Sequence, residues 1–448
     1  MLTVKEAEAR AAALVEAGRR AGADAADVLY IGEAATGIQV RLGALEDVDR
    51  SEGEEIGLRF FIGARSASVS SSDLSDEALR ALADRASAMA REAPEDPYSG
   101  LAPEDRLLRD GGADIDGDDG GDPEPVALKA RAIEIEDAAR SVAGVTNSEG
   151  AGVSAGRTVI ALATSHGFCR GYSTSGYSAS ASVIAGEGGS MQRDYAHHSV
   201  RHLADLEPAE ATGRRAGERA VARLNPAKLA SGRMPVVFDP RVGASLVGHL
   251  VSAMAGSSIT RRTSFLVGRE DELLFDEAIV IRDDPHRRRG LRSKPFDGEG
   301  LATQASDLVA GGRLTGWLLD SASARQLGLE PTGHASRGIG GPPGAGATNV
   351  HMEPGPLSRS ELIADIGSGL YVTELIGQGV NPVTGDYSRG AGGFIIENGE
   401  LAAPVAEITI AGNLIDMFRA LTPANDLDFR RATNVPTLRI EGLTVAGA

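Results

Sequence analysis

Apolar and polar positions follow two different periods along the first 91 residues of the chain. Residues 2–20 and 75–91 carry apolar side chains at helical spacing, with charged residues on the outer face. Between them, residues 26–72 change to a two-residue alternation that is interrupted by glycine-containing segments. This pattern predicts five short strands between two helices.

Helical and strand-like patterns continue through the rest of the chain. Residues 126–142 and 207–224 are predicted helices, and the small-residue segments between them, residues 147–188, are expected to form an antiparallel meander. Beyond residue 232 most segments have strand character. The predicted fold class is therefore α+β, with an N-terminal α/β region that contains a small mixed or antiparallel sheet and a β-rich C-terminal domain.

Breaks in this pattern divide the chain into three predicted domains. An N-terminal α+β domain spans residues 1–95, a central domain of meander and helices spans 115–225, and a β-rich C-terminal domain spans 232–448. Residues 92–125 are rich in proline, glycine and aspartate. Because their aspartates lack the glycine and the closing glutamate of a calcium loop, an acidic interdomain linker is the expected structure.

The charge and the cysteine content exclude several classes of protein. The chain carries a net charge of −18 at pH 7, which repels nucleic-acid backbones. Cys169 is the only cysteine, so no disulfide can form within the chain. The longest uncharged stretch, residues 242–260, is too rich in serine and glycine to span a bilayer. Since charged residues also stand where a signal peptide would be apolar, we expect a soluble, cytoplasmic protein without nucleic-acid or membrane partners.

A glycine-rich segment near the C-terminus carries the most specific pattern of the chain. Residues 377–399, GQGVNPVTGDYSRGAGGFIIENG, place apolar and polar residues between the glycines, which predicts tight turns leading into a strand. This segment resembles the C-terminal signature of the TldD/PmbA (TldD/TldE) family, whose members are cytosolic metallopeptidase subunits that work as an unequal pair. Residues 147–151, 262–266 and 348–355 resemble other blocks of that family.

The catalytic member of that pair carries an HExxxH motif on a helix. Its two imidazoles hold a divalent metal, and its carboxylate moves the proton of a metal-bound water. Here the corresponding predicted helix is residues 242–257, where His249 matches the first ligand, Leu250 replaces the base and Met254 replaces the second ligand. Leucine cannot accept a proton, and a thioether is a poor ligand for zinc. We therefore predict no metal in this chain and a buried or interface position for His249.

The resemblance and the degenerate motif together imply a function. They correspond to the PmbA/TldE-like, non-catalytic subunit of a metallopeptidase that acts in proteolysis and peptide maturation. The implied partner is a TldD-like subunit that supplies HExxxH and zinc, while this chain helps to hold unfolded peptide substrates in extended form. Residues near the family blocks are the candidates for lining the shared substrate cavity: His249, Arg261, Arg262, Glu374, Asn381 and Asp386.

The sequence leaves two other functions open. The chain could act alone as a homodimer that binds peptides without cleaving them. It could also be a hydrolase with an unrecognised metal site, for which His334, His351 and Glu353 supply a candidate ligand set. A paralogue with HExxxH would favour the two-subunit function, whereas zinc bound to the isolated chain would favour the independent hydrolase.

Overall fold

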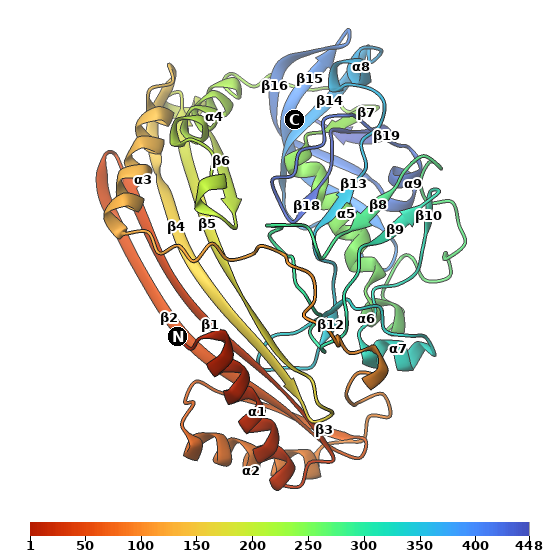
Figure 1. The fold of residues 1–448 in the computed structure, drawn as a ribbon. Helices are drawn as coiled ribbons and strands as arrows, with labels where there is room; N and C mark the ends of the chain where they lie inside the picture. The colour runs from red at the N-terminus through yellow and green to blue at the C-terminus, as the bar shows by residue number, and fades with distance from the viewer. Residues whose placement is uncertain (448) are drawn as a thin grey trace.

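The computed structural model describes residues 1–447 and consists of two halves, each with a six-stranded sheet (Figure 1). The strands of the N-terminal half are β1 (Ala25–Arg41), β2 (Ala44–Ile62), β3 (Arg65–Ser71), β4 (Val145–Thr164), β5 (Cys169–Ala185) and β6 (Gln192–Val200). They pair antiparallel in the order β3-β2-β1-β4-β5-β6. The helices are α1 (Val4–Arg20), α2 (Asp76–Glu92), α3 (Pro125–Arg140) and α4 (Ala209–Ala222), with short 3-10 helices η1 (Glu104–Arg106), η2 (Gly188–Ser190) and η3 (Leu203–Asp205).

The four long helices lie where the helical spacing predicts them. Thr3 and Glu6 form a capping box at the start of α1, and the Ser75 hydroxyl accepts a hydrogen bond from the backbone of Ala78 at the start of α2. Their apolar faces bury two separate clusters, one shared by α1, α2 and strands β1–β4, the other by α3, α4, the end of β1 and strands β4–β6. Within residues 1–447, no helix combines the length and the apolar character needed to cross a bilayer.

Residues 26–72 form two long strands, β1 and β2, and the short strand β3, so the prediction of five short strands was wrong. The chain reverses only at Leu42–Gly43, where φ is 53° and 79°, and near Gly63, where φ is 56°. The other glycines lie inside strands. A Cβ on Gly57 would lie 2.1 Å from the backbone oxygen of Ile339. This glycine therefore permits close packing against the C-terminal half and does not mark a turn.

The predicted N-terminal and central domains, residues 1–95 and 115–225, share one sheet. β1 is hydrogen-bonded to β2 on one side and to β4 on the other, and its pairing with β4 extends over residues 27–40. The segment that separates the two predicted domains therefore does not interrupt the hydrogen-bonded ladder. The helices lie at opposite ends of this long sheet, α1 and α2 at one end and α3 and α4 at the other (Figure 1).

The C-terminal half contains a second six-stranded sheet and several smaller elements. The sheet consists of β7 (Gly232–Phe238), β14 (Ser368–Ile376), β15 (Asp386–Glu397), β16 (Glu400–Asn413), β17 (Leu421–Pro423) and β19 (Leu438–Ala446). Its order is β16-β15-β14-β7-β19-β17, and an additional pairing of β16 with β19 closes five of these strands into a ring. The remaining elements are α5 (Pro240–Met254), α6 (Gly256–Thr260), β8 (Ile281–Asp283), β9 (Ser306–Ala310), β10 (Arg313–Leu314), α7 (Ser321–Leu327), β11 (Ala335–Ser336), β12 (Gly344–Ala345), β13 (Val350–Met352), α8 (Arg359–Ile363), α9 (Leu414–Arg419) and β18 (Thr433–Asn434). The strand-rich C-terminal half confirms the predicted α+β class.

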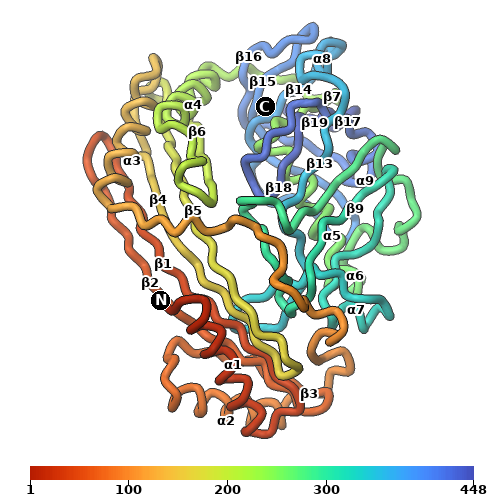
Figure 2. The backbone as a smooth tube through the Cα atoms, viewed as in Figure 1, coloured from red at the N-terminus to blue at the C-terminus, as the bar shows by residue number. Residues whose placement is uncertain are grey.

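The acidic segment between α2 and α3 crosses from one half of the molecule to the other (Figure 2). Its aspartates pair with arginines on both sides. Asp118 accepts a hydrogen bond from Nε of Arg157 in β4 at 2.8 Å, and Asp116 accepts one from Nε of Arg289 in the C-terminal half at 2.7 Å. The predicted linker is thus attached to both halves by ion pairs.

A buried cluster of charged side chains, here called the ionic junction, joins the two halves. It consists of Asp27, Arg59, Glu299 and Arg337, whose side chains are at most 7% exposed. Asp27 accepts hydrogen bonds from Nε of Arg59 at 3.0 Å and from Nη1 of Arg337 at 2.5 Å, and Glu299 lies 4.0 Å from Arg59. Although burial acts in the opposite direction, the two guanidinium groups lower the pKa of Asp27. Asp27 is therefore an anion that holds cations from both halves.

Candidate functional site

Helix α5 carries the three positions of the degenerate motif. Asp239 caps its first turn by accepting a hydrogen bond from the backbone of Arg241 at 2.9 Å, and the helix ends at Met254 before a break at Ala255. Leu250 and Met254 are 0% and 1% exposed and belong to the largest apolar cluster. The positions that would hold the base and the second metal ligand therefore face the hydrophobic core.

His249 lies at the edge of this apolar face and is partly exposed. Its ring packs edge-on against Tyr387, with centroids 6.3 Å apart, and its buried Nε2 has no hydrogen-bond partner within residues 1–447. Burial and the nearby positive charge of Arg389 lower the pKa of His249. At neutral pH His249 is accordingly an uncharged imidazole beside a guanidinium group.

These residues do not fit a zinc ion. One nitrogen donor is present, its two motif companions are apolar, and Arg389 is a cation that would repel a metal. In the part of the chain that the structure describes, no group of three or more His, Cys, Asp or Glu side chains is arranged to hold a metal. The degenerate motif thus has the structure of a packing helix.

The ligand set of His334, His351 and Glu353 is not assembled either. His351 lies 3.3 Å from Glu353, but His334 instead contacts Asp283, with Nε2 at 3.4 Å from Oδ2. In the β8–β13 ladder, Asp283 is opposite Val350 and His351 is opposite Arg282. Because successive residues of a strand point to opposite faces, the two imidazoles lie on opposite sides of this ladder.

Asn381 and Asp386 build the loop of the glycine-rich segment. The amide oxygen of Asn381 accepts a hydrogen bond from the backbone of Val383 at 2.9 Å, and Asp386 accepts one from the Thr384 hydroxyl at 2.7 Å. A Cβ on Gly379 would lie 1.7 Å from a backbone oxygen of the opposite segment, so the turn requires glycine there. Both candidate side chains are exposed and support the loop through hydrogen bonds.

Arg261 and Arg262 lie shortly before a segment that contacts this loop. They follow α6 as exposed residues, and Arg262 has a left-handed backbone with φ of 56°. The backbone of Phe265, a few residues later, donates a hydrogen bond to the carbonyl of Pro382 at 2.8 Å. The two sequence-predicted arginines thus precede, by four and three residues, a backbone contact with the turn that carries Asn381.

Glu374 belongs to a different site, a cavity of about 260 Å³ between the two halves. It forms an ion pair with Arg223 at the end of α4. Arg241 lines the same cavity and binds Asp194 of β6 with two hydrogen bonds of 2.7 and 3.0 Å. Of the six predicted cavity residues, only Glu374 lines this space between the halves.

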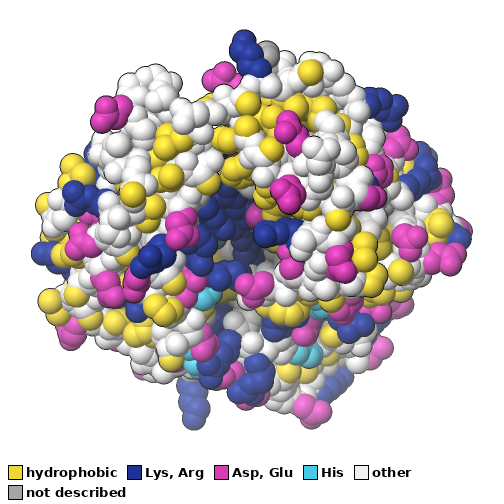
Figure 3. Space-filling view, turned by 90° about the horizontal axis from the view of Figure 1, so that it is seen from above, with side chains coloured by type: hydrophobic (Ala, Val, Ile, Leu, Met, Phe, Trp, Pro, Cys, Tyr) yellow, Lys and Arg dark blue, Asp and Glu magenta, His cyan; other side chains and the backbone are white. Residues whose placement is uncertain are grey.

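A second cavity of about 230 Å³ adjoins the first and shares Arg241 with it. We call it the arginine pocket. Seen from above in Figure 3, the centre of the molecule is hollowed, and Lys and Arg side chains gather on its walls. Sequence reasoning missed this pocket. Its charged and titratable lining residues are His197, Arg215, Arg219, Arg241, Arg359, Arg430 and Arg431, together with Asp239, Asp426 and Asp428.

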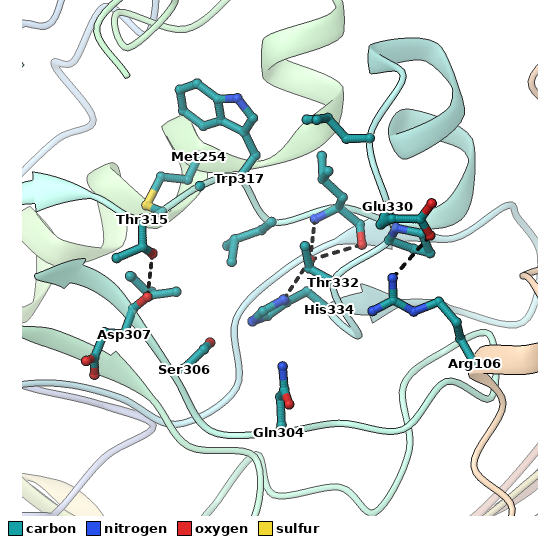
Figure 4. Close-up of a pocket in the computed structure, with 16 residues that line it drawn as sticks. Arg106, Met254, Gln304, Ser306, Asp307, Thr315, Trp317, Glu330, Thr332 and His334 are labelled. Carbon is teal, nitrogen blue, oxygen red and sulfur yellow. Dashed lines mark hydrogen bonds and ion pairs between the residues drawn. The ribbon is translucent and has the colours of Figure 1, made fainter. Parts of the chain in front are cut away.

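A third cavity, of about 450 Å³, lies at the C-terminal end of α5 (Figure 4). Met254 and Trp317 form one side of it, and His334 points into its centre. The Thr332 hydroxyl holds Nδ1 of His334 at 2.8 Å. A mixed polar and apolar lining of this kind suits a small ligand with an apolar body.

The chain is similar to known proteins over most of its length. Profiles of the PmbA/TldA metallopeptidase match the chain, domain 1 at residues 26–90, the central domain at 118–224 and the C-terminal domain at 231–447. Metalloprotease PmbA of Escherichia coli O157:H7 is 37% identical over 428 residues, which cover 95% of this chain and 92% of that protein. A crystal structure from Bacteroides thetaiotaomicron superposes with a TM-score of 0.92 at 26% identity over 100% of both chains. TldE from Thermococcus kodakarensis has the same fold, with a TM-score of 0.87 at 21% identity over 98% of this chain and 100% of that one.

Proposed function

This chain belongs to the PmbA/TldA (PmbA/TldD) metallopeptidase family, and we propose that it is the non-catalytic, PmbA/TldE-like subunit of a cytoplasmic two-subunit metallopeptidase. The partner is a TldD-like chain that carries HExxxH and zinc. This chain completes the partner's substrate cavity and helps to hold unfolded peptides for proteolysis and peptide maturation.

The observation that carries the proposal is the chemistry of α5. Peptide hydrolysis by a bound metal requires at least two good ligands and a carboxylate beside the metal-bound water. His249 stands alone on this helix, since Leu250 and Met254 are packed in the core and Arg389 is the charged neighbour. A chain of this family that cannot hold the metal needs a partner that does.

Two features support a role in holding peptides. β6 is a terminal strand of the N-terminal sheet, and an extended peptide can add to such an edge through main-chain hydrogen bonds. The cavities lined by Glu374 and by the arginines open beside this strand, with Asp194 and Tyr195 of β6 in the wall of the first. A substrate strand bound at β6 would therefore run past charged side chains of both halves.

Reconstitution with the HExxxH paralogue tests the proposal. Each purified chain and their mixture are assayed on an unfolded protein and on a short peptide, and zinc is quantified in each chain. We expect hydrolysis that is abolished by a chelator in the mixture, none by this chain alone, and stoichiometric zinc only in the paralogue. Chelator-sensitive hydrolysis by this chain alone would overturn the assignment.

A double variant tests directly whether α5 lacks only the residues of the motif or also the surroundings that a metal site needs. Leu250→Glu with Met254→His restores the motif letters, but we expect no hydrolysis, because the remaining ligands and the groups that orient them are absent. The matched control is the same pair of positions in the paralogue, where removing Glu and His should abolish activity of the mixture. Robust hydrolysis by the restored chain would contradict the proposed role of α5.

A further inference from the structure

The arginine pocket is built by five segments that are distant in the sequence. β6 contributes His197, α4 contributes Arg219, the start of α5 contributes Arg241, the start of α8 contributes Arg359, and the segment before β18 contributes Arg430 and Arg431. The pocket therefore exists only when the two halves are packed together. Such convergence of cations is unusual in a chain with a net charge of −18.

Three of the six arginines that line this pocket are paired with carboxylates. Glu207 takes both Arg215 and Arg430, the latter at 2.6 Å. Arg241 is bound to Asp194 at 2.7 Å. These ion pairs hold together the segments that form the pocket. The uncompensated positive charge of the pocket comes from the other arginines.

Arg219 and Arg431 have no such partner. Nη1 of Arg219 donates to the carbonyl oxygen of Tyr195 at 3.2 Å, and Nη1 of Arg431 donates to the carbonyl oxygen of Arg241 at 3.0 Å. Within residues 1–447, neither guanidinium group has a carboxylate within 4.0 Å. Since each guanidinium carries five N–H donors, most of their donors are left for a ligand.

Within the described residues, the aspartates that line the pocket form no ion pair with Arg219 or Arg431, although the charge of Asp239 acts to raise the pKa of both guanidinium groups. Asp239 caps α5 and accepts a hydrogen bond from the Tyr371 hydroxyl at 3.0 Å. Asp426 binds the backbone and the hydroxyl of Thr437, both at 2.7 Å. Asp428 is largely exposed and lies 3.9 Å from Arg430. Asp239 thus offsets part of the positive charge without binding either guanidinium group, Asp426 is bound to Thr437, and Asp428 is open to solvent.

The titration of neighbouring groups reports a positive potential inside the pocket. Burial, and then Arg431, Arg219, Arg430 and Arg215, lower the pKa of His197. Burial followed by the charge of Arg241 lowers the pKa of Arg219 as well. Cations that are partly buried beside one another are destabilising unless an anion joins them.

We propose that the arginine pocket binds a carboxylate group of a peptide, held between Arg219 and Arg431. A carboxylate matches the planar fork of a guanidinium group, and the volume of about 230 Å³ admits a terminal residue or an acidic side chain. The choice of a peptide as the ligand rests on the proposed function; the anion site itself does not. The carboxylate can be the C-terminus of the peptide or the side chain of Asp or Glu, and the test separates these two sources.

Binding of three matched peptides to the full-length chain without its partner tests the inference. All have the same uncharged sequence and an N-terminal fluorophore: one ends in a free carboxylate, one is amidated, and one is amidated but contains a single Glu. Fluorescence anisotropy at low salt gives each Kd. We expect at least one carboxylate peptide to bind about tenfold more tightly than the fully amidated peptide, as for a charge-assisted pair of hydrogen bonds. Equal affinities for all three peptides would overturn the inference.

Variants then locate the site. Arg219→Gln and Arg431→Gln, singly and together, should remove the preference for the carboxylate peptide. Arg214→Gln is the matched control, because Arg214 is an exposed residue of α4 that pairs with Glu210 outside the pocket. Preserved preference in a folded double variant would place the carboxylate elsewhere and refute the inference. If the double variant does not fold, the single variants decide in the same way.

A spectroscopic readout distinguishes direct binding from a structural effect. Because a bound anion offsets the arginines, the pKa of His197 measured by NMR should rise when the carboxylate peptide is added and should not change with the fully amidated peptide. An unchanged His197 pKa at saturation with the carboxylate peptide would contradict binding in this pocket. Failure here with an active mixture of the two chains would refute only the carboxylate site, whereas carboxylate binding without an active mixture would refute only the two-subunit function.

Discussion

Charged side chains join the two halves of the molecule at the ionic junction and at the arginine pocket, and the two places use them differently. In the ionic junction, Asp27 takes up both Arg59 and Arg337, and water is excluded. In the arginine pocket, Arg219 and Arg431 stand next to a cavity without a carboxylate of their own. Arginine therefore holds the two halves together where a carboxylate pairs with it, and it remains available to a ligand where no carboxylate does.

This difference has a consequence for stability. Removing one partner from a buried, matched cluster leaves the other charges without compensation, which is costly. Removing a cation that has no carboxylate partner from an open cavity leaves no uncompensated charge, and it relieves the repulsion between neighbouring arginines. Substitutions at the two places should thus have effects of different size, and the largest effect belongs to the ionic junction.

Asp27→Ala is expected to destabilise the protein by about 3–5 kcal/mol, because two buried guanidinium groups lose their shared anion. Urea unfolding followed by circular dichroism measures the effect. Asp49→Ala is the matched control, since Asp49 is an exposed residue of β2 and its loss should change stability by less than about 0.5 kcal/mol. If the two variants unfold at the same urea concentration, the ionic junction does not hold the halves together.

Glu299 makes the stability of the ionic junction depend on pH. Burial, and then the charge of Asp297, raise the pKa of Glu299 to about 7. A carboxyl group whose pKa is raised by folding contributes stability below its unfolded pKa and loses it as pH rises through the folded value. We expect a loss on the order of 2–3 kcal/mol between pH 4.5 and 7.5 that is absent in Glu299→Gln.

The comparison of wild type with Glu299→Gln across this pH range isolates the contribution of Glu299, because every other titrating group is common to both. Glu55→Gln is the control, as Glu55 is exposed on β2 and should leave the pH profile unchanged. A profile that is identical in wild type and Glu299→Gln would show that Glu299 does not titrate between these values.

The sequence predicted the helices better than the strands. α1 and α2 follow from apolar spacing and from the caps at Thr3 and Ser75, which are local features. The strands of residues 26–72 were divided wrongly, because a glycine in a turn and a glycine in a tightly packed strand look alike in sequence. Gly57 is in a strand because Ile339, almost three hundred residues later, packs against it.

The candidate site was predictable only where its residues are neighbours in the sequence. His249, Leu250 and Met254 share one helix, so their chemistry could be read directly. The arginine pocket could not, because its side chains come from five segments of both halves. The one available signal was an arginine-rich helix, residues 207–224, in an acidic chain. The sequence does not show which residues face these arginines across the pocket, so their role could not be inferred from it.

Glu207→Gln should increase the number of arginines in the pocket that lack a carboxylate partner. Although burial acts against them, hydrogen bonds from Arg215, Arg430 and Thr212 lower the pKa of Glu207 to about 2. Its neutralisation frees two more cations, so stability should fall by about 1 kcal/mol after solvent screening, while affinity for a carboxylate peptide should rise. Thermal unfolding and the anisotropy assay measure both. Weaker peptide binding would mean that Glu207 holds the pocket in shape and that free arginine charge does not limit binding.

Arg219→Met should have the smallest effect on stability, with a change within about 0.5 kcal/mol of wild type. The variant loses one hydrogen bond to the Tyr195 carbonyl and the attraction of Asp239 and Asp194, and the accompanying relief of repulsion from Arg241 and Arg215 offsets this loss. Arg59→Met provides the contrast, because it leaves the buried Asp27 with a single partner and should cost about 3 kcal/mol or more. Both variants remove one guanidinium group from the N-terminal half where it faces the C-terminal half, so urea unfolding compares them directly. Equal destabilisation would mean that Arg219 is a structural cation like Arg59, and the distinction between a matched junction and an open pocket would no longer hold.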